Sequence, residues 1–155
     1  GSCAVWVEDE EWHMFYTAFE PWWEGSDRQH PSYRLREAIS TDGRSWTRTQ
    51  RVVLDFEHEG EYVIGKPMIV HDPDLTRLWY CYRGESYRIG YAESSNGRDF
   101  VRRDDLVEIG VSKNGWDSEM IEYGFVFDHQ GQRYMVYNGN QFGQTGLGLA
   151  IQAGS

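Results

Sequence analysis

A short segment that occurs twice at the same spacing constrains the fold of this chain more than any other feature. Residues 38–48 (AISTDGRSWTR) recur as residues 92–102 (AESSNGRDFVR). Each copy predicts a strand that ends in serine, an Asp-Gly or Asn-Gly pair, and a second strand that opens with an aromatic residue. Asp-Gly and Asn-Gly supply the positive φ values of a two-residue β-hairpin turn. We therefore expect two tight hairpins in equivalent places.

A second pattern occurs three times and places these hairpins in a larger unit. Short, alternating aromatic strands are predicted at residues 12–16, 77–80 and 133–137. A smoother apolar strand precedes each of them, at residues 3–8, 67–71 and 122–127. One unit therefore has an apolar inner strand, an aromatic second strand, a third strand ending in Ala or Ser, and an outer strand. This arrangement is typical of a β-propeller blade.

The fold predicted is all-β, a single partial β-propeller of just under three four-stranded blades. The blades are expected at residues 3–53 and 61–106, with an incomplete third at 119–153. An aromatic content of 15% and 17 glycines favour strands joined by tight turns, and 155 residues suit one domain. The best helical candidate, residues 104–110, is too short and lacks an apolar period.

Charge and cysteine usage exclude several classes of partner. A formal net charge of −10 would repel the phosphate backbone, so no nucleic-acid partner is expected, although a local basic site could hold one acidic sugar. Cys3 and Cys81 show no metal-binding spacing and the histidines are scattered, so neither a metal nor another cofactor is expected. No signal peptide or membrane-length apolar run is recognised. The default expectation is a cytoplasmic protein without a membrane partner.

Several blocks of sequence carry a resemblance to a known group. They are EY (61–62), KP (66–67), WYCYR (79–83), YRIGYAES (87–94), GWDSEM (115–120), YMVYNGN (134–140) and GLGLA (146–150). In these blocks the chain resembles the C-terminal blades of five-bladed β-propeller glycosidase-like proteins, relatives of arabinanases, β-xylosidases and fructosidases. The resemblance implies a carbohydrate-active protein with its site on the channel axis.

The chain also departs from this group. Members usually have five blades, and the carboxylate that acts as nucleophile or base on an early blade has no counterpart here. Lys66 stands where the family usually has Arg, and Gly124 where it usually has Pro. The first change replaces a planar bidentate donor with a point charge. Whether the chain is an enzyme is therefore left open.

Catalytic candidates follow from the position that the resemblance implies, at the channel ends of the inner strands. Glycoside hydrolysis needs two carboxyl groups, about 5 Å apart for retention or roughly 6.5–9.5 Å apart for inversion. Glu61 and Glu119 each precede an inner strand and are expected to face one axis. Glu119, with Asp117 and Tyr123 nearby, is the best candidate for a general acid. Glu122 is the alternative if the strand begins later than expected.

Substrate-binding candidates are cations, amides and indoles near the same strand ends. Lys66, Arg83 and Arg88 are expected to tune the acid or to bind a sugar hydroxyl or carboxylate. Asn138 and Asn140, together with Trp22 and Trp23 as a stacking platform, complete the set.

Most of these candidates also have a structural interpretation. Glu61 and Asp117 would bind backbone N–H groups in the connections between blades. Arg83 and Arg88 would form ion pairs between blades. Asn138 and Asn140 would occupy turns. Trp22 and Trp23 would cover a core edge or an oligomer contact.

Three functional hypotheses follow. The first is a glycoside-hydrolase-like protein, active or degenerate; the second is a non-catalytic glycan-binding module. The third is a scaffold or fragment whose blades complete a propeller with itself or a partner. An open arc of blades leaves apolar faces and a free strand edge, so we expect ring closure by self-association, most simply as a homodimer.

Overall fold

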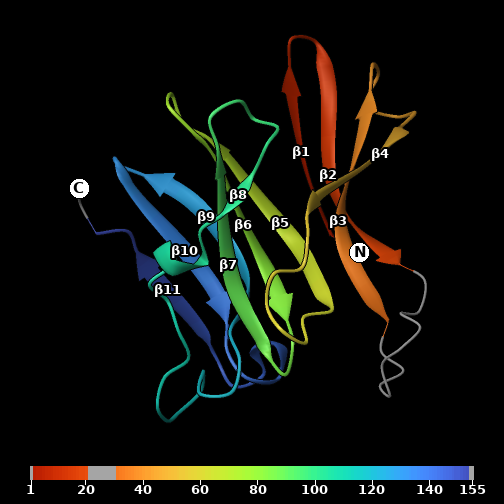
Figure 1. Ribbon diagram of the computed structural model, residues 1–155. Coiled ribbons are helices and arrows are strands. Elements are labelled where there is room, and N and C mark those ends of the chain that lie inside the picture. Colours follow the sequence, from red (N-terminus) through yellow and green to blue (C-terminus); the bar gives the residue numbers. More distant parts are fainter. Residues whose placement is uncertain (1, 21–30, 154–155) are drawn as a thin grey trace.

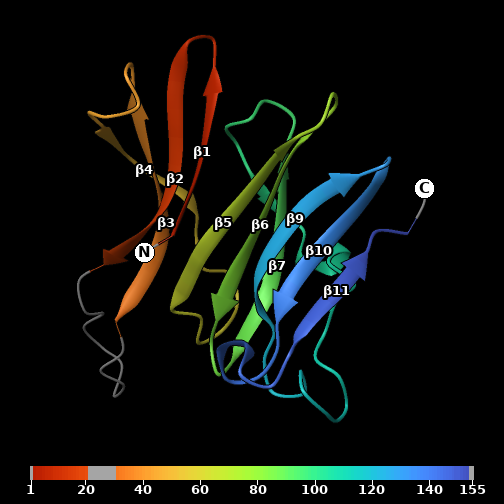
Figure 2. The ribbon, with the colours of Figure 1, turned by 180° about the vertical axis from the view of Figure 1, so that it is seen from behind.

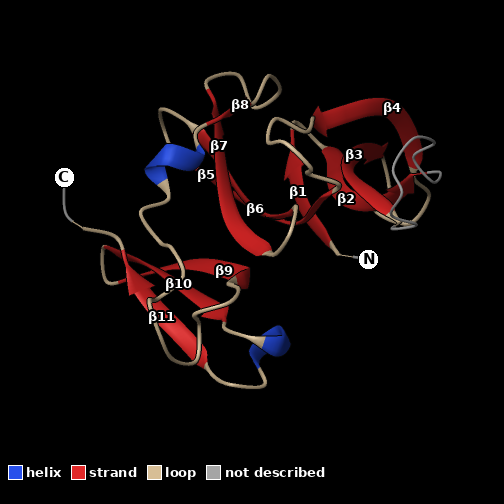
Figure 3. Cartoon of the chain, turned by 60° about the horizontal axis from the view of Figure 1, so that its bottom comes forward, coloured by secondary structure: helices blue, strands red, loops and turns tan. Residues whose placement is uncertain are grey.

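Strands make up most of the part of the chain that the computed structural model describes, residues 2–20 and 31–153. They form three groups that follow one another around an open arc, as Figure 3 shows. In chain order they are β1 (Cys3–Glu8), β2 (Glu11–Glu20), β3 (Ser32–Ser40), β4 (Thr47–Leu54), β5 (Val63–His71), β6 (Thr76–Arg83), β7 (Tyr87–Ser94), β8 (Val101–Arg102), β9 (Glu122–His129), β10 (Gln132–Asn138) and β11 (Leu147–Ile151). Two short 3-10 helices, η1 (Asp104–Leu106) and η2 (Gln141–Gly143), lie in connections.

Within each group, strands that are neighbours in sequence pair antiparallel (Figure 1). We call β1–β4 the first blade, β5–β8 the second and β9–β11 the third. A single parallel pair, Tyr33 with Val63, joins β3 to β5, so the first two blades are hydrogen-bonded into one eight-stranded sheet. The predicted all-β fold, a partial propeller, is confirmed.

The hydrophobic core lies between the blades rather than within any one of them. A first cluster packs between the first and second blades and contains Phe15, Leu35, Leu78 and Tyr80. A second cluster packs where the third blade lies beside β5 and β6 in Figure 2, and contains Ile89, Ile121, Val126 and Met135. Because strand side chains alternate between faces, each central strand serves one interface with one face and the next interface with the other.

The repeated Asp-Gly and Asn-Gly segments form longer loops than expected. The prediction of two-residue hairpins is wrong in both copies, because residues 41–46 and 95–100 lie outside the strands. The side-chain oxygens of Asp42 and Asn96 each accept the amides two and three residues further on, at 2.7–2.9 Å. These bonds build an Asx-type loop. The positive φ values expected at the glycines are confirmed, at +68° for both Gly43 and Gly97.

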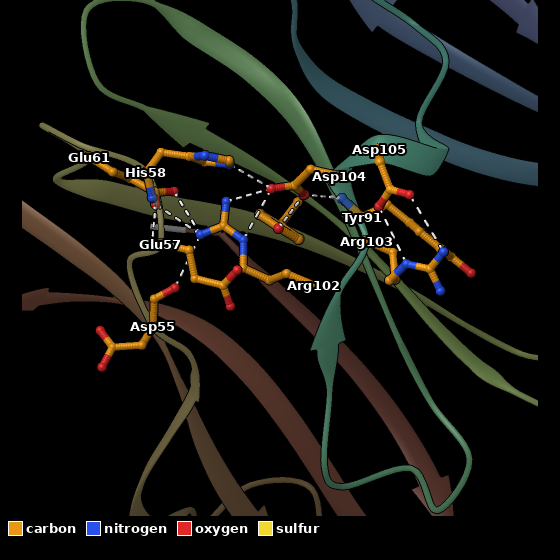
Figure 4. Close-up of polar contacts among 10 residues, drawn as sticks. Asp55, Glu57, His58, Glu61, Tyr91, Arg102, Arg103, Asp104 and Asp105 are labelled. Carbon is orange, nitrogen blue, oxygen red and sulfur yellow. Dashed lines mark hydrogen bonds and ion pairs between the residues drawn. The ribbon is translucent and has the colours of Figure 1, made fainter.

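A buried polar network fastens the connection between the first two blades to the outer strand β8 (Figure 4). The Arg102 guanidinium donates to both carboxylate oxygens of Glu61, at 2.9 and 3.1 Å, and to Asp104 at 2.7 Å. Glu61 also accepts the amides of Glu57 and His58. Burial opposes ionisation of Asp104, but hydrogen bonds led by Tyr80 and His58 hold its pKa below the usual range.

Replacing Arg102 with methionine tests whether this network stabilises the fold. Arg102→Met leaves the buried Glu61 carboxylate without its cation, and losing one partner of a buried ion pair costs about 3–5 kcal/mol of unfolding free energy. Arg103→Met is the matched control, because Arg103 is largely exposed and pairs only on the surface. Urea unfolding of the three proteins makes the comparison. Equal midpoints for Arg102→Met and wild type would contradict the assignment.

Candidate functional site

A pocket of about 390 Å³ lies at the end of the blades where inner strands β5 and β9 begin. All three blades contribute to it. Its lining residues are Ser2, Thr17 and Tyr33 from the first blade, Val63, Gly65, Lys66, Cys81 and Tyr87 from the second, and Tyr123 from the third. Small, hydroxyl-bearing and aromatic side chains dominate, and Lys66 is the one charged group among them. A volume of this size is within the range of small-molecule binding sites.

The pocket owes its shape to an unusual backbone conformation at the start of both inner strands. Lys66 and Tyr123 have φ values of +54° and +53°, in the left-handed region that non-glycine residues seldom adopt. Each amide is bound by the preceding blade. The Lys66 N–H donates to Ser2 Oγ at 3.0 Å and Thr17 Oγ1 at 3.2 Å, and the Tyr123 N–H donates to Cys81 Sγ at 3.0 Å. These contacts offset the strain and present both side chains to the pocket.

Glu122, the first residue of β9, is the most unusual carboxyl group near this pocket. It is fully buried, and neither carboxylate oxygen has a hydrogen-bond partner among the residues that the structure describes. Burial raises its pKa to about 7, and the Arg83 guanidinium opposes that rise only partly. Glu122 also contributes to raising the pKa of the pocket residues Tyr123 and Cys81, which places it beside the pocket wall.

Arg83 accompanies Glu122 and is also incompletely satisfied. Its guanidinium lies over the rings of Tyr87, at 5.1 Å, and Tyr62, at 5.7 Å, while its buried Nε has no hydrogen-bond partner in the described chain. Buried polar groups are nearly always hydrogen-bonded in native proteins. An unpaired carboxyl and an unpaired guanidinium nitrogen beside one pocket therefore indicate a place where a polar ligand or water completes the hydrogen bonds.

The other carboxylates predicted for catalysis do not converge. Glu61 accepts the amides of Glu57 and His58 in the connection between blades, as its structural interpretation predicts, and it also pairs with Arg102. Asp117 is buried; one of its oxygens faces the Tyr137 hydroxyl at 3.5 Å and the other has no partner among described residues. Glu119 is exposed. The inner strand β9 begins at Glu122, so the alternative acid, Glu122, rather than Glu119, is the carboxyl at the start of the strand.

Arg88 and Asn140 hold the loop that carries Glu119. Arg88 donates to the Glu119 carbonyl at 3.0 Å, and the buried Asn140 side chain accepts the amides of Glu119 and Met120 at 2.8 and 3.1 Å. Asn138 donates to the Phe142 carbonyl at 3.2 Å. Arg83 and Lys66 are the predicted cations that lie at or beside the pocket. Trp22 and Trp23 lie outside the residues that the structure describes.

Seven pocket residues were not among the sequence candidates: Ser2, Thr17, Tyr33, Val63, Gly65, Cys81 and Tyr87. Thr17 and Cys81 had a detectable signal, since each follows a tyrosine of the repeated aromatic strand. Burial raises the pKa of Cys81 to about 12, so its thiol stays protonated at neutral pH. Because the thiolate is the reactive form, Cys81 acts here as a packing and hydrogen-bonding group rather than a nucleophile.

Other kinds of site find no support in the part of the chain that the structure describes. No group of three or more His, Cys, Asp or Glu side chains there is arranged to hold a metal ion. Among the same residues, no helix has the length and apolar character needed to cross a membrane.

Comparison with known proteins gives relatives without a defined activity. No protein-family model matches the chain. Two proteins of Mycobacterium tuberculosis, the uncharacterised protein Rv1502 (strain H37Rv) and the uncharacterised protein MT1551 (strain CDC 1551), are each 39% identical to it over 140 residues. The match covers 90% of this chain and 46% of each relative. The chain therefore spans about half the length of the curated relatives it matches.

Solved structures with the same fold are propeller-type glycoside hydrolases. The Bombyx mori GH32 β-fructofuranosidase BmSUC1 matches with a TM-score of 0.75 at 16% identity, over 97% of this chain and 33% of its own. The structure of BT0996 in an RGII complex gives 0.74 at 20%, over 99% and 46%. Zg3597, a family 117 glycoside hydrolase of Zobellia galactanivorans, gives 0.74 at 18%, over 96% and 50%. The chain thus has a glycosidase-like propeller fold.

The raised pKa of Glu122 predicts a specific pH dependence of stability. Glutamate ionises near its ordinary pKa of 4.5 in the unfolded state and near 7 in the folded protein. Between these values only the unfolded state loses its proton, so stability falls as pH rises. The glutamine in Glu122→Gln cannot ionise. The unfolding free energy of this variant, relative to that of wild type, should therefore rise by up to about 3 kcal/mol as the pH increases from 4.5 to 7.

Urea unfolding at several pH values measures this difference. Glu119→Gln is the control, because it removes an exposed carboxylate three residues away and should reproduce the wild-type pH profile. A difference between Glu122→Gln and wild type that does not change with pH would show that the pKa of Glu122 is the same in the folded and unfolded states, which contradicts the prediction.

Proposed function

We propose that the pocket is a carbohydrate site and that Glu122 is its general acid, in a glycoside-hydrolase-like protein. The observation that supports this most directly is a fully buried, unpaired carboxyl with a pKa of about 7 beside a pocket shared by three blades. A general acid works best when its pKa lies near the working pH, and glycosidases obtain such a value by burying one carboxyl group.

In the proposed reaction, Glu122 gives its proton to the glycosidic oxygen as the bond from that oxygen to the anomeric carbon breaks. The group attached through that oxygen leaves as an alcohol. Water then adds to the anomeric carbon of the remaining sugar and loses one proton to a base. That second role needs another carboxylate. None of the described lining residues is a carboxylate. In this proposal the chain therefore supplies the proton donor and most of the binding pocket, and a carboxylate beyond this lining supplies the second role.

The lining also suits a sugar ligand. Tyr33, Tyr87 and Tyr123 offer ring faces for the C–H groups of a pyranose and hydroxyls for its oxygens. Lys66 enters no ion pair with another described residue and lines the pocket, while Arg83 lies beside Glu122. Below pH 7 the Glu122 carboxyl is largely protonated, so Lys66 and Arg83 give the site a net positive charge. We expect it to prefer a sugar unit bearing a carboxylate.

A non-catalytic glycan-binding module is the second candidate. The described lining residues include no carboxylate, and Glu122 lies behind them, fully buried, which favours this candidate. Both candidates use the same pocket. They differ in whether Glu122 transfers a proton or only binds a hydroxyl group, so measuring binding and hydrolysis side by side on one set of sugars separates them.

Glu122→Gln and wild type are compared for hydrolysis on a panel of chromogenic glycosides and for binding on a glycan array. If Glu122 is the acid, the variant should lose at least a hundredfold in hydrolysis, the usual contribution of a positioned acid, and keep its glycan binding. Glu119→Gln should match wild type in both assays. Binding without any hydrolysis by wild type would select the binding module. A chain that neither binds nor hydrolyses any sugar would contradict both candidates.

Lys66→Met tests whether the positive charge selects the ligand, because methionine nearly keeps the length of the side chain and removes its charge. Affinity for a uronic acid should fall about tenfold, the effect of one lost charge-assisted hydrogen bond, while affinity for the neutral sugar of the same stereochemistry should change little. Calorimetric titration with the two sugars makes the comparison, and the exposed Lys113→Met is the control. An equal loss for both sugars would show that the positive charge does not select the ligand.

A further inference from the structure

The two contacts between blades within this chain use the same hydrogen-bonding device. In each, the acceptor is the residue that follows a tyrosine of the second strand, Tyr16 in the first blade and Tyr80 in the second. This residue accepts a hydrogen bond from a backbone N–H group of the next blade. Thr17 accepts the N–H of Lys66, and Cys81 accepts the N–H of Tyr123. Both donors are the left-handed residues of the inner strands. The device therefore marks the side of a blade onto which a further blade packs.

Asn138 occupies the equivalent position in the third blade. It follows Tyr137, and it pairs with Glu122 across the strands as Cys81 pairs with Gly65 in the second blade. Its amide nitrogen donates to the Phe142 carbonyl, which leaves the amide oxygen as the acceptor. The strand face that carries Asn138 also carries Val136 and Tyr134, opposite the face of Met135 that packs on the second blade.

This side of the third blade, which we call the front face, is apolar and exposed. Its prominent residues have exposed fractions of 37–67% and are Phe125, Phe127, Leu147, Leu149 and Ile151. The strand register places Val136 between Phe125 and Leu149. In the second blade the corresponding side carries Met68, Val70 and Trp79, which the third blade covers. An apolar sheet face of this extent indicates a docking surface.

The first blade has the matching surface on its opposite side, which we call the back face. Val5, Val7 and Trp12 are exposed there by 44%, 53% and 37%. Val5 pairs with Met14 across β1 and β2. The same Val–Met pair, Val126 with Met135, is what the third blade packs against the second. The back face therefore repeats the chemistry of a surface that already binds a front face in this fold.

We propose that a second copy of the chain docks head to tail, with the front face of each third blade against the back face of the other copy's first blade. In this arrangement the start of β1 of one copy lies beside Asn138 of the other copy, where a backbone N–H group can donate to the Asn138 amide oxygen. Two copies related by a twofold axis make this contact twice and close a ring, which covers both apolar faces. The partner is a second copy because the chain itself carries both complementary faces.

Two variants test the contact, each placing a charge on one face. Val5→Arg places a charge on the back face of each copy, and Leu149→Arg places a charge on the front face of each copy. Light scattering after size exclusion should give wild type a mass twice the 18.1 kDa of the chain and give each variant alone the single-chain mass. A mixture of the two variants retains one intact front face and one intact back face, so it should recover a one-to-one complex. Both sites are exposed, and near-ultraviolet circular dichroism verifies that the variants fold.

Leu106→Arg is the control, since Leu106 is 47% exposed but lies on neither face, and this variant should remain dimeric. A wild-type chain with the single-chain mass at micromolar concentration would overturn the proposal. So would a Val5→Arg variant that still dimerises, because a front-to-front contact alone gives that result. These outcomes concern association only and are independent of whether Glu122 is an acid.

Discussion

The central constraint in this structure is one backbone amide near the start of β5 and one near the start of β9, each of which the preceding blade must bind. A left-handed residue such as Lys66 or Tyr123 costs conformational energy, of the order of 1–3 kcal/mol, and persists only where its surroundings hold it. Here the holding groups are Thr17 and Cys81 on the neighbouring blade. Local strand geometry is therefore set by contacts between blades, and the pocket forms where those contacts meet.

The same constraint explains the environment of Glu122. Because Tyr123 is fixed by Cys81, the residue before it has no freedom to turn its carboxyl to solvent, and the packing of β9 on the second blade keeps it buried. Such a group reduces stability at neutral pH. In the Arg102 network nearly every charge has a partner, and none of its members lines the pocket. The contrast between these paired charges and the unpaired Glu122 supports the proposal that the pocket binds a ligand.

Much of the fold could be predicted because the repeated strands have recognisable short-range sequence patterns. The alternating aromatic segments identify β2, β6 and β10, since period-two alternation is a short-range property. The hairpins were predicted too short, because the Asx bonds of Asp42 and Asn96 compete with a tight turn and dipeptide rules omit them. The site was harder to predict. Glu119 and Glu122 are three residues apart, and only the point at which β9 begins decides which one is buried. Ser2 and Tyr33 reach the pocket through tertiary contacts that no local pattern encodes.

Net charge and local charge act over different distances, which bears on the kind of ligand the pocket suits. A chain with a formal charge of −10 repels a long polyanion along its whole length. Salt screens charges beyond about 8 Å at physiological ionic strength, so a single acidic sugar inside the pocket responds mainly to Lys66 and Arg83. For the proposed carbohydrate site, those two effects together would favour an isolated carboxylate on an otherwise neutral glycan over a uniformly charged one. Under that proposal, the acidity of the whole protein would add selectivity to the pocket instead of contradicting its local positive character.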